Sequence, residues 1–384
     1  MSRKTIGVVV NGATGRMGYR QHLVRSLLAI RAQGGLELPD GAVLWPEPVL
    51  VGRSVERLKA IADRHGLERW TTSLDEALAD PDCSVYFDAQ VTAQRVPAVL
   101  AAIDAGKHVY VEKPTADSLE GALRVARAAR DAGLVHGVVA DKLYLPGLLK
   151  LRRLIDGGFF GRILSVRIDF GYWVFEGDWQ PAQRPSWNYR DADGGGIALD
   201  MFPHWHYLLT TLIAPIESVY CQVSTHIPTR WDEQGQAYEA TADDAAYAVL
   251  GLRDGIVAAV TASWATRVNR EELLEVQVDG TLGSAVAGLR TCTVQDRAMT
   301  PRPVWNPDVD NPERFRDQWA PVPDNAEFDN GFKAQWELFL TAAYQGTPFR
   351  HDLFDGARGV QLALLALESA RAGCRLPVPP LDER

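Results

Sequence analysis

The 384-residue sequence is poor in cysteine and has no excess of basic residues. Its formal net charge is −9, whereas a nucleic-acid-binding surface needs clustered Lys and Arg. The cysteines lie far apart without a CxxC pair, which excludes a disulfide framework or a cysteine zinc site and favours a reducing compartment. They are Cys83, Cys221, Cys292 and Cys374. We therefore expect a cytoplasmic protein without a nucleic-acid partner.

Long hydrophobic runs are also missing. No segment approaches the roughly 20 apolar residues of a membrane span, and the apolar stretch Ile6–Val10 near the N-terminus is too short for a signal peptide. The composition, 46% hydrophobic and 23% charged, is typical of a globular protein. The length is sufficient for two domains, each with its own core, and we expect no membrane partner.

The first part of the chain alternates apolar runs with segments of helical spacing, which predicts βαβ units and a parallel sheet. The expected strands are Thr5–Val10, Pro48–Val51, Ser84–Phe87, His108–Val111 and Val135–Val139. The expected helices are Ser54–His65, Leu74–Ala79, Ala93–Ala105 and Ser118–Ala132. Ser54 and Ser118 are suitable N-caps for two of these helices. The segment Gly34–Pro48 is rich in Gly and Pro, and we interpret it as a surface insertion.

The pattern changes past residue 145. A predicted helix is followed by runs of strands without helices between them, which favours a mostly antiparallel sheet. These elements are Leu148–Ile155, then Ile163–Phe170, Ser218–Ser224, Ala246–Leu252, Ile256–Trp264 and Leu274–Val278. Residues 296–325 are Pro-rich and irregular, and two helices, Gly331–Tyr344 and Gly356–Ala372, close the chain. We predict an α/β protein: a Rossmann-type parallel-sheet domain (residues 1–142), then an α+β domain (143–384) with a large, open, mostly antiparallel sheet.

A glycine-rich turn follows the first strand directly. It reads Asn11-Gly12-Ala13-Thr14-Gly15-Arg16-Met17-Gly18, with GxxGxxG spacing in place of the commoner GxGxxG. Glycines at such a turn let the backbone approach a pyrophosphate at the N-terminus of the next helix. The turn therefore predicts a dinucleotide site that includes Gly12, Thr14, Gly15, Arg16 and Met17.

The residues that distinguish NAD from NADP are expected at the end of the second strand. An acid there would bind the ribose 2′-hydroxyl of NAD, but the sequence is Val51-Gly52-Arg53-Ser54. Arg53 and Ser54, with Arg57 or Arg16, could bind a 2′-phosphate instead. The sequence thus favours NADP(H) over NAD(H), which is the alternative.

Two further groups of residues suit proton and hydride chemistry. Glu112 and Lys113 end a predicted strand, where ligands of open α/β sheets bind, and a lysine there can hold a substrate hydroxyl. Asp200 and His204 are spaced i, i+4, so both can face one side of a helix. Histidine titrates near neutral pH and suits reversible proton transfer.

The motif Ala105-Gly106-Lys107-His108-Val109 leading into Glu112-Lys113-Pro114 resembles the glucose-fructose oxidoreductase/inositol dehydrogenase/MocA family. Other motifs resemble that family in the same order along the chain: Gly158–Gly161, the run from Gly194 to His204, and the helix Ala366–Gly373. The resemblance implies that Lys113 contacts the reacting hydroxyl, Asp200 orders the site and His204 is the acid–base catalyst. It also implies homo-oligomers, dimer or tetramer, formed through the open sheet face.

The chain departs from the family pattern at several points. Val91-Thr92 and Arg95 stand where the family often has Pro-Asn and a histidine, and Asp141-Lys142-Leu143 where it often has Asn-Arg. We place Lys142 among the substrate-binding residues. His204 and His206 form an HxH, but residues i and i+2 do not face each other on a helix, so we predict no metal site.

An aromatic segment lies just before the triple glycine that leads to Asp200. It includes Trp187 and Tyr189, which could wall a pocket for a sugar or cyclitol ring, or could pack a loop or a subunit contact. The leading hypothesis is an NAD(P)-dependent dehydrogenase of a sugar, cyclitol or glycoside. The alternatives are a glycosidase that oxidises its sugar transiently, and a non-catalytic nucleotide sensor.

Overall fold

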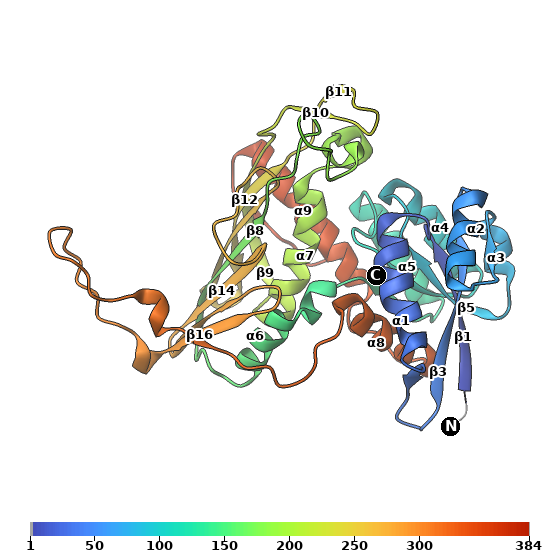
Figure 1. Ribbon diagram of the computed structural model, residues 1–384, viewed down its shortest axis with the longest axis horizontal. Coiled ribbons are helices and arrows are strands. Elements are labelled where there is room, and N and C mark those ends of the chain that lie inside the picture. Colours follow the sequence, from blue (N-terminus) through green and yellow to red (C-terminus); the bar gives the residue numbers. More distant parts are fainter. Residues whose placement is uncertain (1–2, 384) are drawn as a thin grey trace. The chain divides into compact units, whose positions relative to one another are not determined.

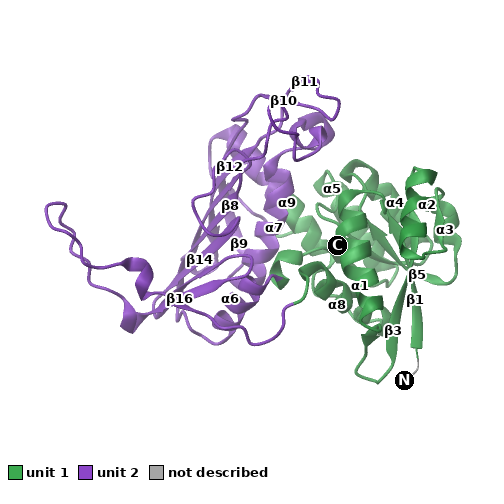
Figure 2. Ribbon diagram, viewed as in Figure 1, with its two compact units in different colours: residues 1–144, 329–361, 380–384 green, residues 145–328, 362–379 purple. Residues whose placement is uncertain are grey.

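The computed structural model describes residues 3–383, which form two compact units (Figure 2). Of the described residues, unit 1 comprises 3–144, 329–361 and 380–383, and unit 2 comprises 145–328 and 362–379. This division differs from the expectation that residues 143–384 form one domain, because residues 329–361 pack with the N-terminal sheet. The reason is the apolar face of helix α8 (Gly331–Gln345), whose Trp336, Phe339 and Leu340 are fully buried in the core of unit 1.

Unit 1 is built on a sheet with the strand order β2-β3-β1-β5-β6-β7, in which β4 also pairs with β3. All pairs are parallel except β2 with β3. The strands are β1 (Arg3–Asn11), β2 (Leu36–Glu37), β3 (Val43–Val51), β4 (Trp70–Thr71), β5 (Cys83–Asp88), β6 (His108–Val111) and β7 (His136–Val138). The parallel order β4-β3-β1-β5-β6-β7 is that of a Rossmann-type dinucleotide-binding sheet, with its reversal between β1 and β5.

The interpretation of Gly34–Pro48 as a surface insertion is wrong in its second half. Residues 43–48 belong to β3 and pair in parallel with β1. The prolines of this segment argued against a strand, because a proline cannot donate a hydrogen bond to a neighbouring strand. Pro46 and Pro48 are accommodated because β2 pairs only with residues 43 and 44 of β3 and β4 only with residues 50 and 51, so the stretch between has no strand neighbour on that side.

Helices cover the sheet of unit 1 and begin largely where the sequence predicts. They are η1 (Gly18–Leu27), α1 (Leu28–Ala32), α2 (Val55–His65), α3 (Leu74–Ala79), α4 (Thr92–Asp104), α5 (Leu119–Asp131), η2 (Asp141–Tyr144) and α8. Ser54 and Ser118 cap α2 and α5, each accepting a hydrogen bond from a backbone N–H of the first turn. Both cap predictions are confirmed.

Unit 2 is built on one broad sheet with the order β17-β16-β15-β14-β8-β13-β12-β9-β18, mostly antiparallel, with β8 and β13 parallel. Its strands are β8 (Ile163–Gly171), β9 (Ile216–Ser224), β12 (Ala245–Leu252), β13 (Val257–Ser263), β14 (Leu274–Gly280), β15 (Gly283–Ala287), β16 (Cys292–Asp296), β17 (Ala320–Pro321) and β18 (Leu376–Pro377), and β10 (Thr229–Trp231) pairs separately with β11 (Ala237–Glu239). Its helices are α6 (Pro146–Asp156), η3 (Ser186–Tyr189), η4 (Asp191–Asp193), α7 (Ile197–Leu212), η5 (Arg253–Gly255), η6 (Arg297–Met299), η7 (Phe315–Gln318) and the later part of α9 (Leu353–Ala372). Helices α6 and α7 pack on one face of the sheet (Figure 1).

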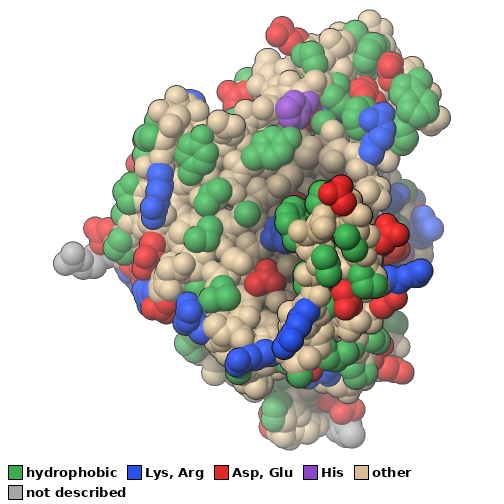
Figure 3. Space-filling model, turned by 90° about the vertical axis from the view of Figure 1, so that its left-hand side faces the viewer, with side chains coloured by type: hydrophobic (Ala, Val, Ile, Leu, Met, Phe, Trp, Pro, Cys, Tyr) green, Lys and Arg blue, Asp and Glu red, His purple; other side chains and the backbone are tan. Residues whose placement is uncertain are grey.

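The opposite face of this sheet is open and carries hydrophobic side chains (Figure 3). Tyr247, Val249 and Val257, on neighbouring strands, are among its exposed residues. The Pro-rich segment beyond β16 holds only short 3-10 turns and the two-residue β17, as its irregular sequence suggests. Among residues 3–383, no helix combines the length and apolar character needed to cross a membrane.

Candidate active site

The carboxyl ends of four neighbouring strands in unit 1 lie side by side. In the parallel register, Asn11 of β1 is opposite both Val51 of β3 and Asp88 of β5, and Asp88 is opposite Val111 of β6. The segments that follow these residues therefore emerge at one edge of the sheet. This edge carries the glycine turn, the nucleotide-selecting segment at Gly52, and the Glu112-Lys113 pair.

The glycine turn has the backbone that a pyrophosphate cradle requires. Gly12 has φ +84°, and a Cβ there would lie 2.8 Å from the backbone of Ala89. A Cβ at Gly18 would collide with the carbonyl oxygen of Gly12. The turn leads into η1, and N–H groups of a first helical turn have no acceptor within the helix. The turn therefore fits an anionic phosphate group, and contacts of Thr14, Gly15, Arg16 and Met17 with a nucleotide stay a prediction.

The segment expected to select the nucleotide is basic. Arg53, Arg57 and the side chain of Arg16 are exposed, and no acid occurs between Val51 and Val55. The hydroxyl of Ser54 already accepts the backbone N–H of Arg57 at 3.3 Å, but it keeps its own proton to donate. The residues fit a nucleotide that carries a 2′-phosphate.

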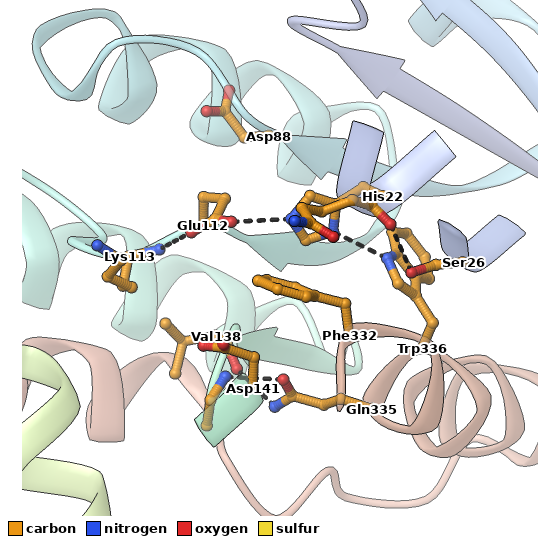
Figure 4. Close-up of polar contacts among 12 residues, drawn as sticks. His22, Ser26, Asp88, Glu112, Lys113, Val138, Asp141, Phe332, Gln335 and Trp336 are labelled. Atoms are coloured by element: carbon orange, nitrogen blue, oxygen red, sulfur yellow. Dashed lines mark hydrogen bonds and ion pairs between the residues drawn. The ribbon is translucent and has the colours of Figure 1, made fainter. Parts of the chain in front are cut away.

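Lys113 is half-buried, and a chain of buried side chains holds its backbone (Figure 4). The indole Nε1–H of Trp336 donates to Nδ1 of His22 at 3.0 Å. Nε2 of His22 lies 2.8 Å from Oε1 of Glu112, and Oε2 of Glu112 accepts the backbone N–H of Lys113 at 3.0 Å. Helix α8, helix η1 and the end of β6 thus meet at the proposed catalytic lysine.

The carboxyl group of Glu112 is ionised in this setting. Burial raises its pKa, but the hydrogen bond from His22 and the positive charges of Lys113 and Arg95 more than offset burial, so the pKa of Glu112 stays below its ordinary value. An ionised carboxylate can accept at both oxygens, as the contacts to His22 and to the Lys113 N–H require.

A second buried network reaches the other side of Lys113. Asn11, just before the glycine turn, donates to the hydroxyl of Tyr86 at 2.8 Å, and that hydroxyl donates to Asp88 at 2.7 Å. Asp88 is ion-paired with Arg95 at 2.9 Å, and Arg95 also donates to the carbonyl oxygen of Pro114. This network gives Arg95, one of the departures from the family pattern, a structural role: it connects the strand end of β5 to the residue after Lys113.

In unit 2, Asp200 and His204 lie on α7, whose start is fixed by a residue from another loop. Asp243 accepts the N–H of Ala198 at 2.8 Å, and a Cβ at Gly196 would lie 2.5 Å from the same carboxylate. The last glycine of the triple-glycine motif therefore leaves room for Asp243. Burial raises the pKa of Asp243 to about 6, although the N–H of Ala198 opposes this shift.

Both catalytic candidates on α7 have side-chain partners. Nδ1 of the buried His204 lies 2.6 Å from the hydroxyl of Tyr207. Asp200 is ion-paired with Arg184 at 3.0 Å. The guanidinium of Arg184 also lies 4.2 Å from the ring centroid of Trp264, a cation–π distance. Burial lowers the pKa of Arg184, but Asp200 and Tyr172 raise that pKa by a larger amount, so its net shift is upward. The guanidinium therefore stays charged beside Asp200.

The other predicted substrate residues differ in exposure. Trp187 is 41% exposed, whereas Tyr189 is 2% exposed, with its ring 3.8 Å from the guanidinium of Arg230. The packing interpretation describes Tyr189 well, and its contact with substrate stays a prediction. Lys142 lies in η2 of unit 1, 3.9 Å from Asp141. Within the described part of the chain, no group of three or more His, Cys, Asp or Glu residues could hold a metal ion.

Sequence reasoning missed five residues that support the site: His22, Arg184, Asp243, Trp336 and, as a partner of Arg95, Asp88. Trp336 lies 314 residues from His22, and Asp243 lies 45 residues from Ala198. No periodicity or motif connects positions so far apart. Only Asp88 had a local signal, since it ends a strand at the edge where ligands bind.

Two family models match the chain. Residues 6–139 match an oxidoreductase family with an NAD-binding Rossmann fold, and residues 148–286 match a GFO/IDH/MocA C-terminal domain. The two matches cover more than half of the chain, in the order that the sequence motifs indicate.

Relatives extend the match over the whole length. A D-xylose dehydrogenase of Paenarthrobacter nicotinovorans is 54% identical over 380 residues, 98% of each chain. A 1,5-anhydro-D-fructose reductase of Ensifer adhaerens is 33% identical over 46% of this chain and 48% of that protein. Among solved structures, levoglucosan dehydrogenase in complex with NADH and L-sorbose superposes with a TM-score of 0.79 at 23% identity, over 98% of each chain, which shows a common fold.

Proposed function

The chain belongs to the GFO/IDH/MocA family of oxidoreductases, and on that premise we propose that it oxidises the anomeric carbinol of D-xylose, or of a closely related aldose, with a nicotinamide cofactor. The observation that carries the proposal is the 54% identity to a D-xylose dehydrogenase along 98% of both chains. The geometry supports it, because each residue type that the reaction needs occurs in a fixed, partly buried setting.

The reaction breaks one C–H and one O–H bond of the cyclic sugar. The bound nicotinamide supplies the chemistry of a hydride acceptor at C4. Lys113 holds the reacting hydroxyl and stabilises negative charge that develops on its oxygen. His204 takes the hydroxyl proton as the general base. The products are a sugar lactone, the reduced cofactor and one proton.

Asp200 would orient the substrate or His204 and not carry the proton. Arg184 lies 3.0 Å from it, and a positive neighbour favours the charged carboxylate. A carboxylate paired with a guanidinium is a good acceptor for sugar hydroxyls but a poor general base near neutral pH. Lys142 and Trp187 are proposed to complete the substrate contacts, Lys142 as a hydrogen-bond donor and Trp187 as an apolar surface for the sugar ring.

For the cofactor we propose NADP(H), with NAD(H) as the alternative. Arg53 and Ser54 follow β3 at the sheet edge that carries the glycine turn, and no acid stands there to bind a 2′-hydroxyl. A 2′-phosphate would gain the charge of Arg53, with Arg57 and Arg16 close in sequence to the same edge.

We also propose that the open sheet face of unit 2 pairs with a second copy of the chain, as a dimer or within a tetramer. Val249 is 49% exposed and lies on β12, which has β13 on one side and β9 on the other. Exposed apolar side chains that are contiguous on one face mark an interaction surface. Light scattering coupled to size-exclusion chromatography tests this, and Val249→Lys should lower the oligomer mass, whereas a wild-type monomer would contradict it.

The test of function is a substrate panel read at the nicotinamide absorbance. We expect absorbance from reduced cofactor with D-xylose and none with a cyclitol or a 1,5-anhydro sugar, because neither has an anomeric hydroxyl. A chain that cleaves a glycoside with no net absorbance change would be the redox-assisted glycosidase, and one that binds cofactor but turns over no sugar would be the sensor. Either result overturns the proposal.

Lys113→Ala provides the matched control. The variant should lose activity by orders of magnitude and still bind NADPH in a fluorescence titration. Turnover like that of the wild-type chain would remove Lys113 from the mechanism.

A further inference from the structure

We propose that His22 and Trp336 are positioning residues for Lys113, and that they set the place of this lysine relative to the helix that carries the cofactor turn. The inference rests on the proposed role of Lys113 in the reaction. The observation that carries it is the continuous buried chain from Trp336 through His22 and Glu112 to the backbone N–H of Lys113 (Figure 4).

The chain of hydrogen bonds fixes one protonation form of His22. An indole nitrogen can only donate, so Nδ1 of His22 has to accept from Trp336. The imidazole proton then resides on Nε2, which donates to Oε1 of Glu112 at 2.8 Å. A second proton on Nδ1 would point at the N–H of Trp336. The neutral Nε2–H form is therefore the one that satisfies every partner, and it orients the Glu112 carboxylate toward the Lys113 N–H.

Packing alone does not account for a histidine at this position. His22 and Trp336 are both 0% exposed, and the ring of His22 lies 4.2 Å from Phe87 and 5.2 Å from Phe332 between ring centroids. An apolar side chain would fill this space without the cost of desolvating an imidazole and a carboxylate. His22 pairs instead with a charged group, the carboxylate of Glu112, which is itself buried. The hydrogen bond between His22 and Glu112 therefore holds the Glu112 carboxylate in one orientation, which apolar packing would not do.

The location of His22 connects the cofactor and the lysine. His22 lies in η1, which begins directly after the glycine turn, so the helix that would receive the pyrophosphate also holds Glu112. Glu112 is tied in turn to the sheet by its own N–H, which donates to the carbonyl oxygen of Asp88 at 2.9 Å. Helix α8 fixes the arrangement from the far end of the sequence, because Gln335 also binds the backbone of Val138 and Ala140 beside β6.

The matched variants are His22→Phe and His22→Gln. Phenylalanine keeps a ring against Phe87 and Phe332 but cannot donate to Glu112, whereas the glutamine amide can donate to Glu112 and accept from Trp336. Misplacement of a reacting group by about 1 Å can cost on the order of 10²-fold in rate. We expect His22→Phe to lower kcat by roughly 10- to 100-fold with KM for the sugar nearly unchanged, and His22→Gln to recover most of the loss. Trp336→Phe should fall between the two.

A second readout does not depend on activity. Without a donor at position 22, the Glu112 carboxylate is no longer held toward the Lys113 N–H. Hydrogen exchange of the Lys113 amide, followed by mass spectrometry on the peptide that contains it, should therefore become faster in His22→Phe but not in His22→Gln. NADPH binding and thermal unfolding confirm that each variant is folded. If His22→Phe does not fold, the comparison of Trp336→Phe with His22→Gln in the same exchange experiment decides.

The outcomes separate this inference from the proposed function. If Lys113→Ala is inactive but folded His22→Phe keeps the wild-type kcat and the wild-type exchange of the Lys113 amide, the positioning role is wrong and the function stands. If Lys113→Ala retains turnover, the proposed function is wrong, whatever His22 does to the exchange.

Discussion

Each of the two units holds the residues that we propose for the reaction by different means. In unit 1, Lys113 follows a strand, and hydrogen bonds fix its backbone from both sides, from Glu112 and, one residue on, from Arg95. In unit 2, Asp200 and His204 lie on a helix, and Arg184 and Tyr207 contact their side chains. A helix already fixes its backbone, so its functional residues need only side-chain partners, whereas a residue after a strand needs its backbone anchored as well.

The largest expected effect is the loss of kcat when His204, the proposed acid–base group, is replaced, compared with replacement of its side-chain partner Tyr207. His204→Ala should lower kcat by about 10²- to 10⁴-fold, the range for loss of a general acid–base group. Tyr207→Phe should cost much less, because the helix still holds the imidazole. Steady-state kinetics on both variants checks this. Equal losses would show that the helix alone does not position His204, which breaks the contrast between the units.

Removal of the buried cation of unit 1 should be the most destabilising change. Arg95→Met leaves Asp88 without its ion-pair partner in a fully buried site, and we expect the free energy of unfolding to fall by about 3–5 kcal/mol. Arg184→Met is the matched change in unit 2, where the Asp200 side chain is 27% exposed and water can compensate in part. Urea unfolding measures both, and equal losses would contradict the deeper anchoring of Lys113.

The start of α7 should make stability depend on pH. Burial raises the pKa of Asp243 to about 6 in the folded chain, above its value of about 4 in the unfolded chain. The folded state therefore binds more protons between these values, so the contribution of Asp243 to stability falls as pH rises from about 4 to about 6, by up to about 3 kcal/mol. Asp243→Asn, which still accepts the N–H of Ala198, should remove this trend. If wild type and variant differ by the same amount in urea unfolding at pH 4 and pH 7, the titration of Asp243 does not matter.

The smallest expected effect concerns the exposed edge of unit 1. Arg53→Ala should raise the Kd for NADPH about tenfold, or about 1.4 kcal/mol, and leave the Kd for NADH unchanged. Arg57→Ala, one turn into α2, serves as a weaker control. Fluorescence titration with both nucleotides checks this. An unchanged NADPH affinity would assign the site to NAD(H).

Much of unit 1 could be predicted from the sequence because its signals are local. The alternation of strand and helix patterns, the turn at Gly12 and the caps Ser54 and Ser118 each depend on a few adjacent residues. The family resemblance, which rests on equally local motifs such as Glu112-Lys113-Pro114, is confirmed. The prolines of β3 misled the prediction, since their fit depends on which neighbours β3 lacks. The place of residues 329–361 in unit 1 could not be predicted for a similar reason, because nothing near Trp336 shows which core it enters.

The sequence by itself predicted the residues that we propose for the chemistry: Lys113 at a strand end, and Asp200 and His204 one helical turn apart. The signals for these residues, a strand end and an i, i+4 spacing, each depend on a few neighbouring residues, so a single sequence is enough to find them. Only the tertiary structure decided what holds them. His22 meets Glu112 across 90 residues and Trp336 across 314, and such partners are chosen by the packing of strands and helices, not by any pattern along the chain.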